Sequence, residues 1–156
     1  IARASSISSG ASRLYRALVD GGLASSVQGA LIPTAEPFLY LLSVTVNSGV
    51  SLASAEACVV HELERVRADG ISPDELTVAL KQLRTRLVFD ADSVTNMAHQ
   101  LGYFATVASW RLVGDLLDRT QAVTLDEVNR VAAVRLDQQR RTVGWFEPVA
   151  PDGDVA

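Results

Sequence analysis

The residues best suited to metal chemistry lie in one short stretch, where Cys58, His61 and Glu62 follow one another closely. A helical zinc site needs two histidines four residues apart on one face, with a glutamate between them as general base. His61-Glu62 begins this pattern, but the residue four positions after His61 is Arg65, which cannot bind a metal. The other histidine, His99, is far away in the sequence. Cys58 and His61 could supply two ligands, but the simpler interpretation is a small buried cysteine and a boundary histidine.

Other catalytic patterns are weaker still. A Ser–His–Asp triad needs no sequence proximity, but no G-x-S-x-G turn supports one here. Gly21-Gly22 precedes a predicted strand, and a phosphate cradle would need a helix at that place. The acidic pairs are interpreted as solvated helix faces and favourable charges at helix N-termini: Glu62 and Glu64, Asp74 and Glu75, Asp126 and Glu127. The aromatic side chains of Trp110, Trp145 and Phe146 are predicted to be buried in the core.

Composition limits the class of protein. The 156 residues suit one domain, and a net charge of −4 from 14 basic and 18 acidic side chains argues against a nucleic-acid partner. The single cysteine permits no internal disulfide. Neither a membrane span nor a signal peptide is visible. We therefore expect a soluble protein, cytoplasmic or periplasmic, and the start at Ile1 without Met suggests a piece of a longer protein.

Hydrophobic periodicity and helix-capping signals predict the order of the elements. The first helix covers residues 12–19 and ends at Gly21-Gly22, and two strands follow at residues 26–32 and 38–46. The second strand alternates with period two, which places Phe38, Tyr40, Leu42, Val44 and Val46 on one face. Helices are then predicted at 51–69, from 72, from 92 or 93, at 110–117 and from 124, followed by a last strand at 141–146. The apolar spacing of the first three predicts their buried faces: Leu52, Ala55, Val59, Leu63 and Val66; Leu76, Leu80, Leu83 and Leu87; and Val94, Met97, Leu101 and Phe104. Ser72 with Glu75 and Thr124 with Glu127 form two capping boxes.

This order predicts an α+β fold, with helices packed on one face of an antiparallel sheet. The last strand is expected to return to the sheet that the first two strands begin. Residues 1–150 are predicted to form a single domain, and residues 151–156 a flexible polar tail.

A set of stretches in a fixed order carries a resemblance to one family. It includes Ser12-Arg13-Leu14-Tyr15-Arg16-Ala17-Leu18-Val19, Gly22-Leu23-Ala24-Ser25-Ser26-Val27, Asp74-Glu75-Leu76, Ala98-His99-Gln100-Leu101-Gly102 and Arg141-Thr142-Val143-Gly144-Trp145. Together they resemble the second, non-zinc domain of pitrilysin/insulinase-type (inverzincin) zinc metallopeptidases. The resemblance implies the metallohydrolase fold of the mitochondrial-processing-peptidase type, and an inactive-type domain.

The resemblance also implies where the chemistry of the full-length enzyme lies. Zinc is bound there by an H-x-x-E-H motif and a downstream Glu on the first domain, none of which is in this chain. The family's substrate-contacting Arg falls on Val19 or Asp20 here, and its Tyr falls on Ser25. Because these residues cannot polarise a peptide carbonyl, no catalytic or metal-binding residue is carried over. The resemblance implies a structural or substrate-chamber domain of a metalloendopeptidase.

Two alternatives stay open beside this interpretation. The chain could belong to a catalytically inactive homologue that serves as a partner subunit or scaffold, or it could be an unrelated α+β binding module, which the ordered resemblance disfavours. The implied partners are a sister domain or second half of the same peptidase, and an unfolded peptide substrate. Apolar surface left open without the sister domain would also favour a homo-oligomer.

Overall fold

The computed structural model describes residues 12–32, 34–36 and 39–147. In chain order they form α1 (Arg13–Tyr15), the π-helical turn η1 (Arg16–Asp20), β1 (Ala24–Ile32), β2 (Leu39–Val46), α2 (Leu52–Asp69), α3 (Pro73–Ala91), α4 (Val94–Val107), α5 (Leu112–Gln121), α6 (Leu125–Arg135) and the 3-10 turn η2 (Gln138–Arg140). The predicted α+β class is confirmed, as is the order of one helix, two strands and a block of helices.

The sheet of the described residues consists of β1 and β2, which pair antiparallel. The register runs from Ala24 opposite Val46 to Ile32 opposite Leu39, with an irregularity next to Ser26. Along β2 the side chains of Leu42, Val44 and Val46 are half-buried and those between them are exposed, as the period-two pattern predicted. Phe38, the predicted start of this strand, lies outside the described residues.

The core lies where η1 and α2 cover one face of the hairpin. Leu18, Ala24, Val27 and Ala55 are buried together. Val44, Val46 and Val59 are among the half-buried residues around them. Ala55 belongs to the stripe predicted for the 51–69 helix, and the other members of the stripe are half-buried: Leu52, Val59, Leu63 and Val66. The sequence pattern therefore identified the correct helix face.

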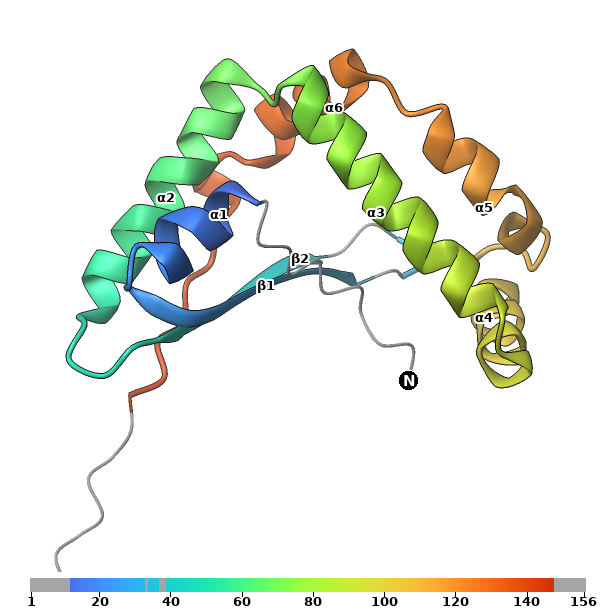
Figure 1. Cartoon of the computed structure of the whole chain (residues 1–156), viewed down its shortest axis with the longest axis horizontal. Helices are drawn as coiled ribbons and strands as arrows, with labels where there is room; N and C mark the ends of the chain where they lie inside the picture. The colour runs from blue at the N-terminus through green and yellow to red at the C-terminus, as the bar shows by residue number, and fades with distance from the viewer. Residues whose placement is uncertain (1–11, 33, 37–38, 148–156) are drawn as a thin grey trace, which may run out of the picture.

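The remaining helices extend away from this core. Figure 1 shows α2 and α3 inclined to each other and joined at the turn of residues 70–72, with α4 at the far end of α3 and α5 beside α3. α3 packs against α4 and α5, whereas α6 returns and packs against α2. We call α1, η1, β1, β2, α2 and α6 the sheet unit, and α3, α4 and α5 the helical arm.

Local signals fix the helix ends. Ser12, Ser51, Ser72, Ser93 and Thr124 each accept a backbone N–H in the first turn of the helix that follows. Both predicted capping boxes, Ser72 with Glu75 and Thr124 with Glu127, are confirmed. α2 ends at Gly70, whose positive φ of 73° is a conformation that other residues adopt only with strain.

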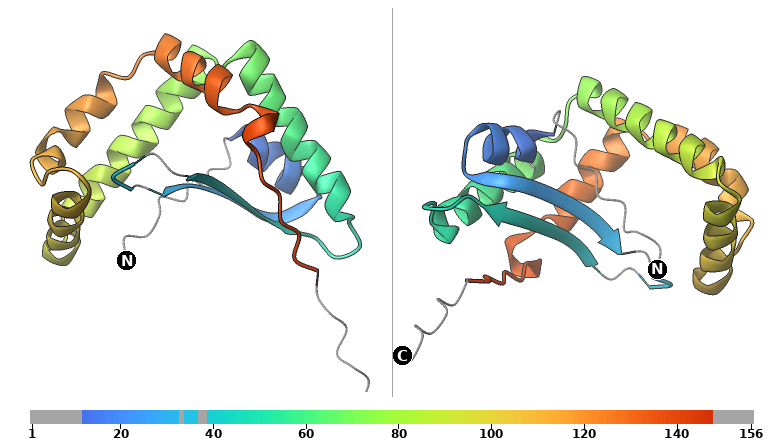
Figure 2. Two further views of the ribbon diagram at one scale, coloured as in Figure 1. Left: turned by 180° about the vertical axis from the view of Figure 1, so that it is seen from behind. Right: turned by 60° about the horizontal axis from the view of Figure 1, so that its bottom comes forward.

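The predicted last strand is wrong. Residues 141–147 form no helix or strand and run beside α2, as the view from behind shows (Figure 2), where the indole Nε1 of Trp145 donates to Glu56 at 3.0 Å. This segment is held on α2 instead, because Glu56 also forms an ion pair with Arg141 Nη2 at 3.8 Å. The fourth helix of the block also differs, because α5 covers Leu112–Gln121 and not residues 110–117.

The predicted burial of several large apolar side chains is also wrong. Trp110 is 53% exposed, Trp145 52% and Phe146 94%. Val94, predicted to face inward from its helix, is 88% exposed. Each of these lies on the helical arm, next to it or in the 141–147 segment, where no second layer of the described chain covers it. The predicted tail, residues 151–156, lies outside the described residues.

Over residues 12–147, as far as they are described, every helix is too short or too polar to cross a membrane.

Candidate functional site

The three candidate metal ligands on α2 do not converge. Cys58 is half-buried and packs against the core, whereas the imidazole of His61 is exposed. Glu62 is buried at 7% exposure, and its carboxylate accepts from Arg65 Nη1 at 2.9 Å. The prediction that Glu62 lies on a solvated face is therefore wrong, because its side chain turns inward and is neutralised by the residue three positions on. Cys58, which was predicted to be buried, is only half-buried, and the structural role of Cys58 and His61 stays a prediction.

His99 lies apart from all three, on the exposed side of α4 in the helical arm. In the described part of the chain, no three His, Cys, Asp or Glu side chains gather closely enough to hold a metal ion. Zinc, which a structural site holds with four N or S ligands, does not fit the residues present. The His61–Arg65 spacing gives the reason, since the second ligand position is a cation that pairs with Glu62.

Cys58 is also poorly suited to act as a nucleophile. Partial burial, with a smaller contribution from the negative charge of Glu62, raises the pKa of its thiol. The thiolate is the reactive form of cysteine, so a raised pKa keeps the group in its unreactive protonated form at neutral pH.

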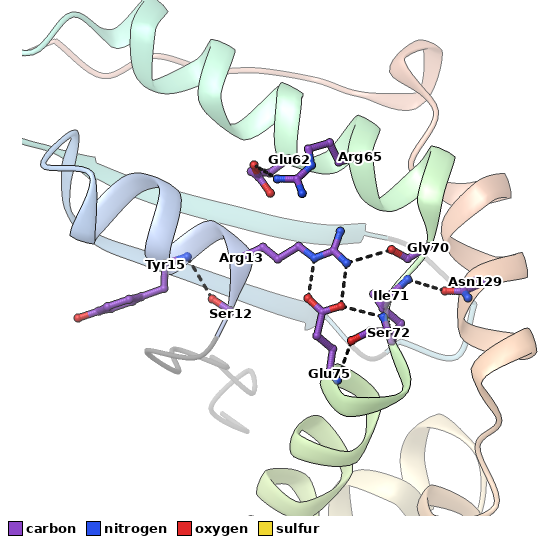
Figure 3. A network of polar contacts seen from close by, with 10 residues as sticks. All are labelled: Ser12, Arg13, Tyr15, Glu62, Arg65, Gly70, Ile71, Ser72, Glu75 and Asn129. Carbon is purple, nitrogen blue, oxygen red and sulfur yellow. Dashed lines mark hydrogen bonds and ion pairs between the residues drawn. The ribbon is translucent and has the colours of Figure 1, made fainter.

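The strongest polar cluster of the described chain is built around Arg13 (Figure 3). Its guanidinium donates from Nε to Glu75 Oε1 at 2.6 Å and from Nη2 to Glu75 Oε2 at 2.7 Å, a bidentate pair. Nη2 also donates to the carbonyl oxygen of Gly70 at 3.2 Å. Ser12 caps α1 and so fixes the backbone from which Arg13 extends. Arg13 of α1 thus donates hydrogen bonds to residues at both ends of the α2–α3 turn.

The same turn is held from α6. The backbone N–H of Ile71 donates to Asn129 Oδ1 at 2.8 Å, and the N–H of Ser72 donates to Glu75 Oε2 at 2.8 Å. Gly70 lies so close to Asn129 that an added Cβ would stand 2.6 Å from its side-chain carbon. The turn of residues 70–72 is therefore contacted from α1, α3 and α6 at once.

The charges in the cluster stabilise one another. The hydrogen bonds from Arg13, opposed by partial burial and helped by the backbone of Ser72, lower the pKa of Glu75 to about 2. The hydrogen bonds that Arg13 donates to Glu75, opposed by partial burial and helped by the charges of Glu75, Glu62 and Asp69, raise the pKa of Arg13. Both groups stay ionised and paired at neutral pH. Their polar atoms are engaged with one another and with the turn, so the chemistry of the cluster is structural.

The positions where the resemblance places an Arg and a Tyr are ordinary fold positions. Val19 is half-buried beside the core, and Asp20 is exposed at the end of η1. Ser25 is exposed, and its hydroxyl donates to the carbonyl oxygen of Thr45 at 3.2 Å across the hairpin. These three side chains are not brought together with the Arg13 cluster.

Sequence reasoning did not identify Arg13 as the centre of a cluster. Glu75 was found through its capping box, which is a local signal, but its partner lies 62 residues earlier. The available hint was a single Arg directly after a capping Ser. Such a pair gives no indication of a distant carboxylate.

The chain is similar to known proteins in both sequence and fold. Residues 6–83 match the protein family described as the peptidase M16 inactive domain. Among solved structures, the chain is similar to a candidate zinc protease from Bordetella pertussis Tohama I, with 28% identity and a TM-score of 0.79, over 90% of this chain and 78% of that one. It is also similar to the inactive peptidase domain of a candidate zinc protease from Bordetella parapertussis, with 26% identity and a TM-score of 0.81, over 94% and 79%.

A protease from Helicobacter pylori shares the fold at 18% identity and a TM-score of 0.73, over 80% of this chain and 30% of that one. No curated protein sequence matches the chain.

Proposed function

Because the chain belongs to the peptidase M16 inactive-domain family, we propose that it is a structural domain of a zinc-dependent metalloendopeptidase and forms part of its substrate chamber. The family match carries this proposal, since it covers η1, the hairpin, α2 and the first half of α3. The similar Bordetella proteins are described as candidate zinc proteases, one of them by its inactive peptidase domain. Zinc would be bound by another domain of the full-length enzyme, which would also supply the water-activating Glu.

The hairpin offers a surface for a sister domain. At the end away from the core, Leu31 is 61% exposed and Tyr40 54%, and these two residues are paired across the strands. Leu39 and Leu41 are exposed on the other face. Neither strand contains a charged residue, so the hairpin lacks the charges that commonly protect an edge strand. This exposed apolar end supports docking of a further domain at the hairpin.

Hydrolysis of an unfolded peptide tests the proposal directly. The purified chain is expected to cleave a quenched fluorescent peptide no faster than buffer does, and to hold far less than one zinc per chain by mass spectrometry. The chain mixed with the zinc-binding domain of the same peptidase, which carries the H-x-x-E-H motif, is expected to cleave the peptide. Omission of the chain should abolish this activity.

Zinc-dependent cleavage by the chain alone would contradict the proposal. A stable complex that carries the zinc motif and binds zinc, yet cleaves no unfolded peptide, would favour the inactive-homologue alternative. A matched pair of variants locates the surface: Tyr40→Ser should weaken the complex, whereas Thr45→Ser, on the same strand near the core, should leave it unchanged.

A further inference from the structure

The sheet unit and the helical arm are joined at a small junction. The chain passes from the first to the second at residues 70–72 and returns at residues 122–124. Inside the sheet unit, α2 contacts η1 and α6, and inside the helical arm α3 contacts α4 and α5. Figure 1 shows the far end of α3 with α4 and α5 well away from α2, so the two parts separate from the 70–72 turn outwards.

The contacts at this junction are polar. Arg13 of the sheet unit makes its bidentate pair with Glu75 in the first turn of α3. Asn129 of the sheet unit accepts from Ile71 in the turn itself. The buried apolar residues of the described chain, Leu18, Ala24, Val27, Ala55 and Ala132, all belong to the sheet unit. No described residue of the helical arm is fully buried, so the directional hydrogen bonds at the junction are the contacts best suited to set the angle between the two parts.

Arg13 is a common partner of α2 and α3. It interacts electrostatically with Glu62 and Asp69 of α2 and is bonded to Glu75 of α3. Its side chain is 21% exposed and that of Glu75 28%, so solvent reaches the pair without surrounding it. A guanidinium that is hydrogen-bonded to Glu75 of α3 and to the carbonyl oxygen of Gly70 at the end of α2 holds the two helices at one separation, because its planar fork fixes the direction of each bond.

We propose that Arg13, Glu75 and Asn129 form a latch that sets the angle between the sheet unit and the helical arm, and that the arm turns about residues 70–72 when the latch opens. The rest of the junction is the three-residue turn itself and the return segment of residues 122–124. The inference concerns the geometry of this chain and is independent of the proposed role in a peptidase.

The distance between the two parts tests the latch. Two spin labels are attached at Ala57→Cys on α2 and Ala98→Cys on α4, both exposed positions, in a Cys58→Ala background. Pulsed electron–electron double resonance should give one narrow distribution of distances between the two labels for the otherwise unchanged chain. Arg13→Gln should broaden it and shift it, and Asn129→Ala should broaden it less. Glu75→Gln should also broaden it, and this variant retains a capping-box oxygen for Ser72.

Two controls separate the latch from loss of folding. Labels at Ala57→Cys and Gln28→Cys, both inside the sheet unit, should keep their distance in every variant. Arg67→Gln removes an ion pair within α2, Arg67 Nη1 to Glu64 Oε2 at 3.0 Å, and should leave the distance to the arm unchanged. An unchanged narrow distribution in both Arg13→Gln and Glu75→Gln would overturn the proposal, as would equal broadening in Arg67→Gln.

Discussion

The sheet unit and the helical arm are built from similar amphipathic helices but are stabilised in different ways. In the sheet unit, η1 and α2 press against the hairpin, and Leu18 is fully buried at 0% exposure. In the described part of α3, α4 and α5 no residue is buried, and the leucines of the predicted inner face of α3 are only half-covered: Leu76, Leu80, Leu83 and Leu87. The comparison shows that an apolar stripe becomes a core only where a second layer covers it.

The largest expected effect separates the two regions by their burial. Leu18→Ala should lower the free energy of unfolding by about 3–4 kcal/mol, because the fully buried side chain leaves a cavity that the sheet and α2 cannot fill. Leu83→Ala on the half-covered face of α3 should lower it by about 1 kcal/mol. Urea denaturation followed by circular dichroism measures both. Equal losses would show that the helical arm is as well packed as the sheet unit.

The turn between the two regions gives the next effect. Gly70→Ala places a Cβ at φ 73°, 2.6 Å from the Asn129 side chain, and should cost about 2–3 kcal/mol. Gly22→Ala is the matched control, since Gly22 has φ 75° with nothing within 4 Å of an added Cβ. It should cost about 1 kcal/mol, which is the conformational strain alone. A Gly70→Ala loss no larger than that of Gly22→Ala would mean that Asn129 moves aside freely.

The ion pair across the junction makes stability depend on pH. Because the folded chain lowers the pKa of Glu75 from 4.5 to about 2, the ionised carboxylate stabilises the folded state above pH 4.5. This contribution is lost progressively as the pH falls from 4.5 toward 2. Glu75→Gln should therefore cost about 1–2 kcal/mol at pH 7, allowing for solvent screening of the pair. The difference from the unchanged chain should be small near pH 2 and vanish below it.

A double-mutant cycle with Arg13→Gln checks the cause of this pH dependence. If Arg13 is the main partner, the two substitutions together should cost clearly less than the sum of their separate effects at pH 7. Additive losses would assign the lowered pKa of Glu75 to the capping box and not to the pair.

The features that the sequence predicted well are local ones. Ser72 and Glu75 are three residues apart, and so are Thr124 and Glu127, and a capping box depends only on such spacing. The β2 strand was predicted from its own alternation. The two-strand core followed because β1 and β2 are separated by a short connection, so their pairing is itself nearly local.

The features that it missed depend on contacts between distant residues. Arg13 and Glu75 are 62 positions apart, Ile71 and Asn129 58, and Glu56 and Trp145 89. Glu62 was assigned to solvent because its type is usually exposed, but its place on α2 turns it inward beside Arg65. The 141–147 segment has strand-forming residues, yet whether it pairs depends on whether the fold places it beside a strand or, as here, against Glu56 of α2, which its composition does not reveal.

The smallest effect concerns that segment and shows to which region it contributes. Trp145→Phe removes the hydrogen bond that the indole donates to Glu56. Because this bond is exposed to solvent, water replaces it, and the free energy of unfolding should fall by at most about 0.5 kcal/mol. Trp110→Phe, at a similarly exposed indole next to Arg111 on the helical arm, is the matched control and should also cost little. With one tryptophan removed, fluorescence of the other follows unfolding of its own region. A Trp145→Phe loss above about 1.5 kcal/mol would mean that the 141–147 segment is an integral part of the sheet unit, because a solvated hydrogen bond alone does not contribute that much.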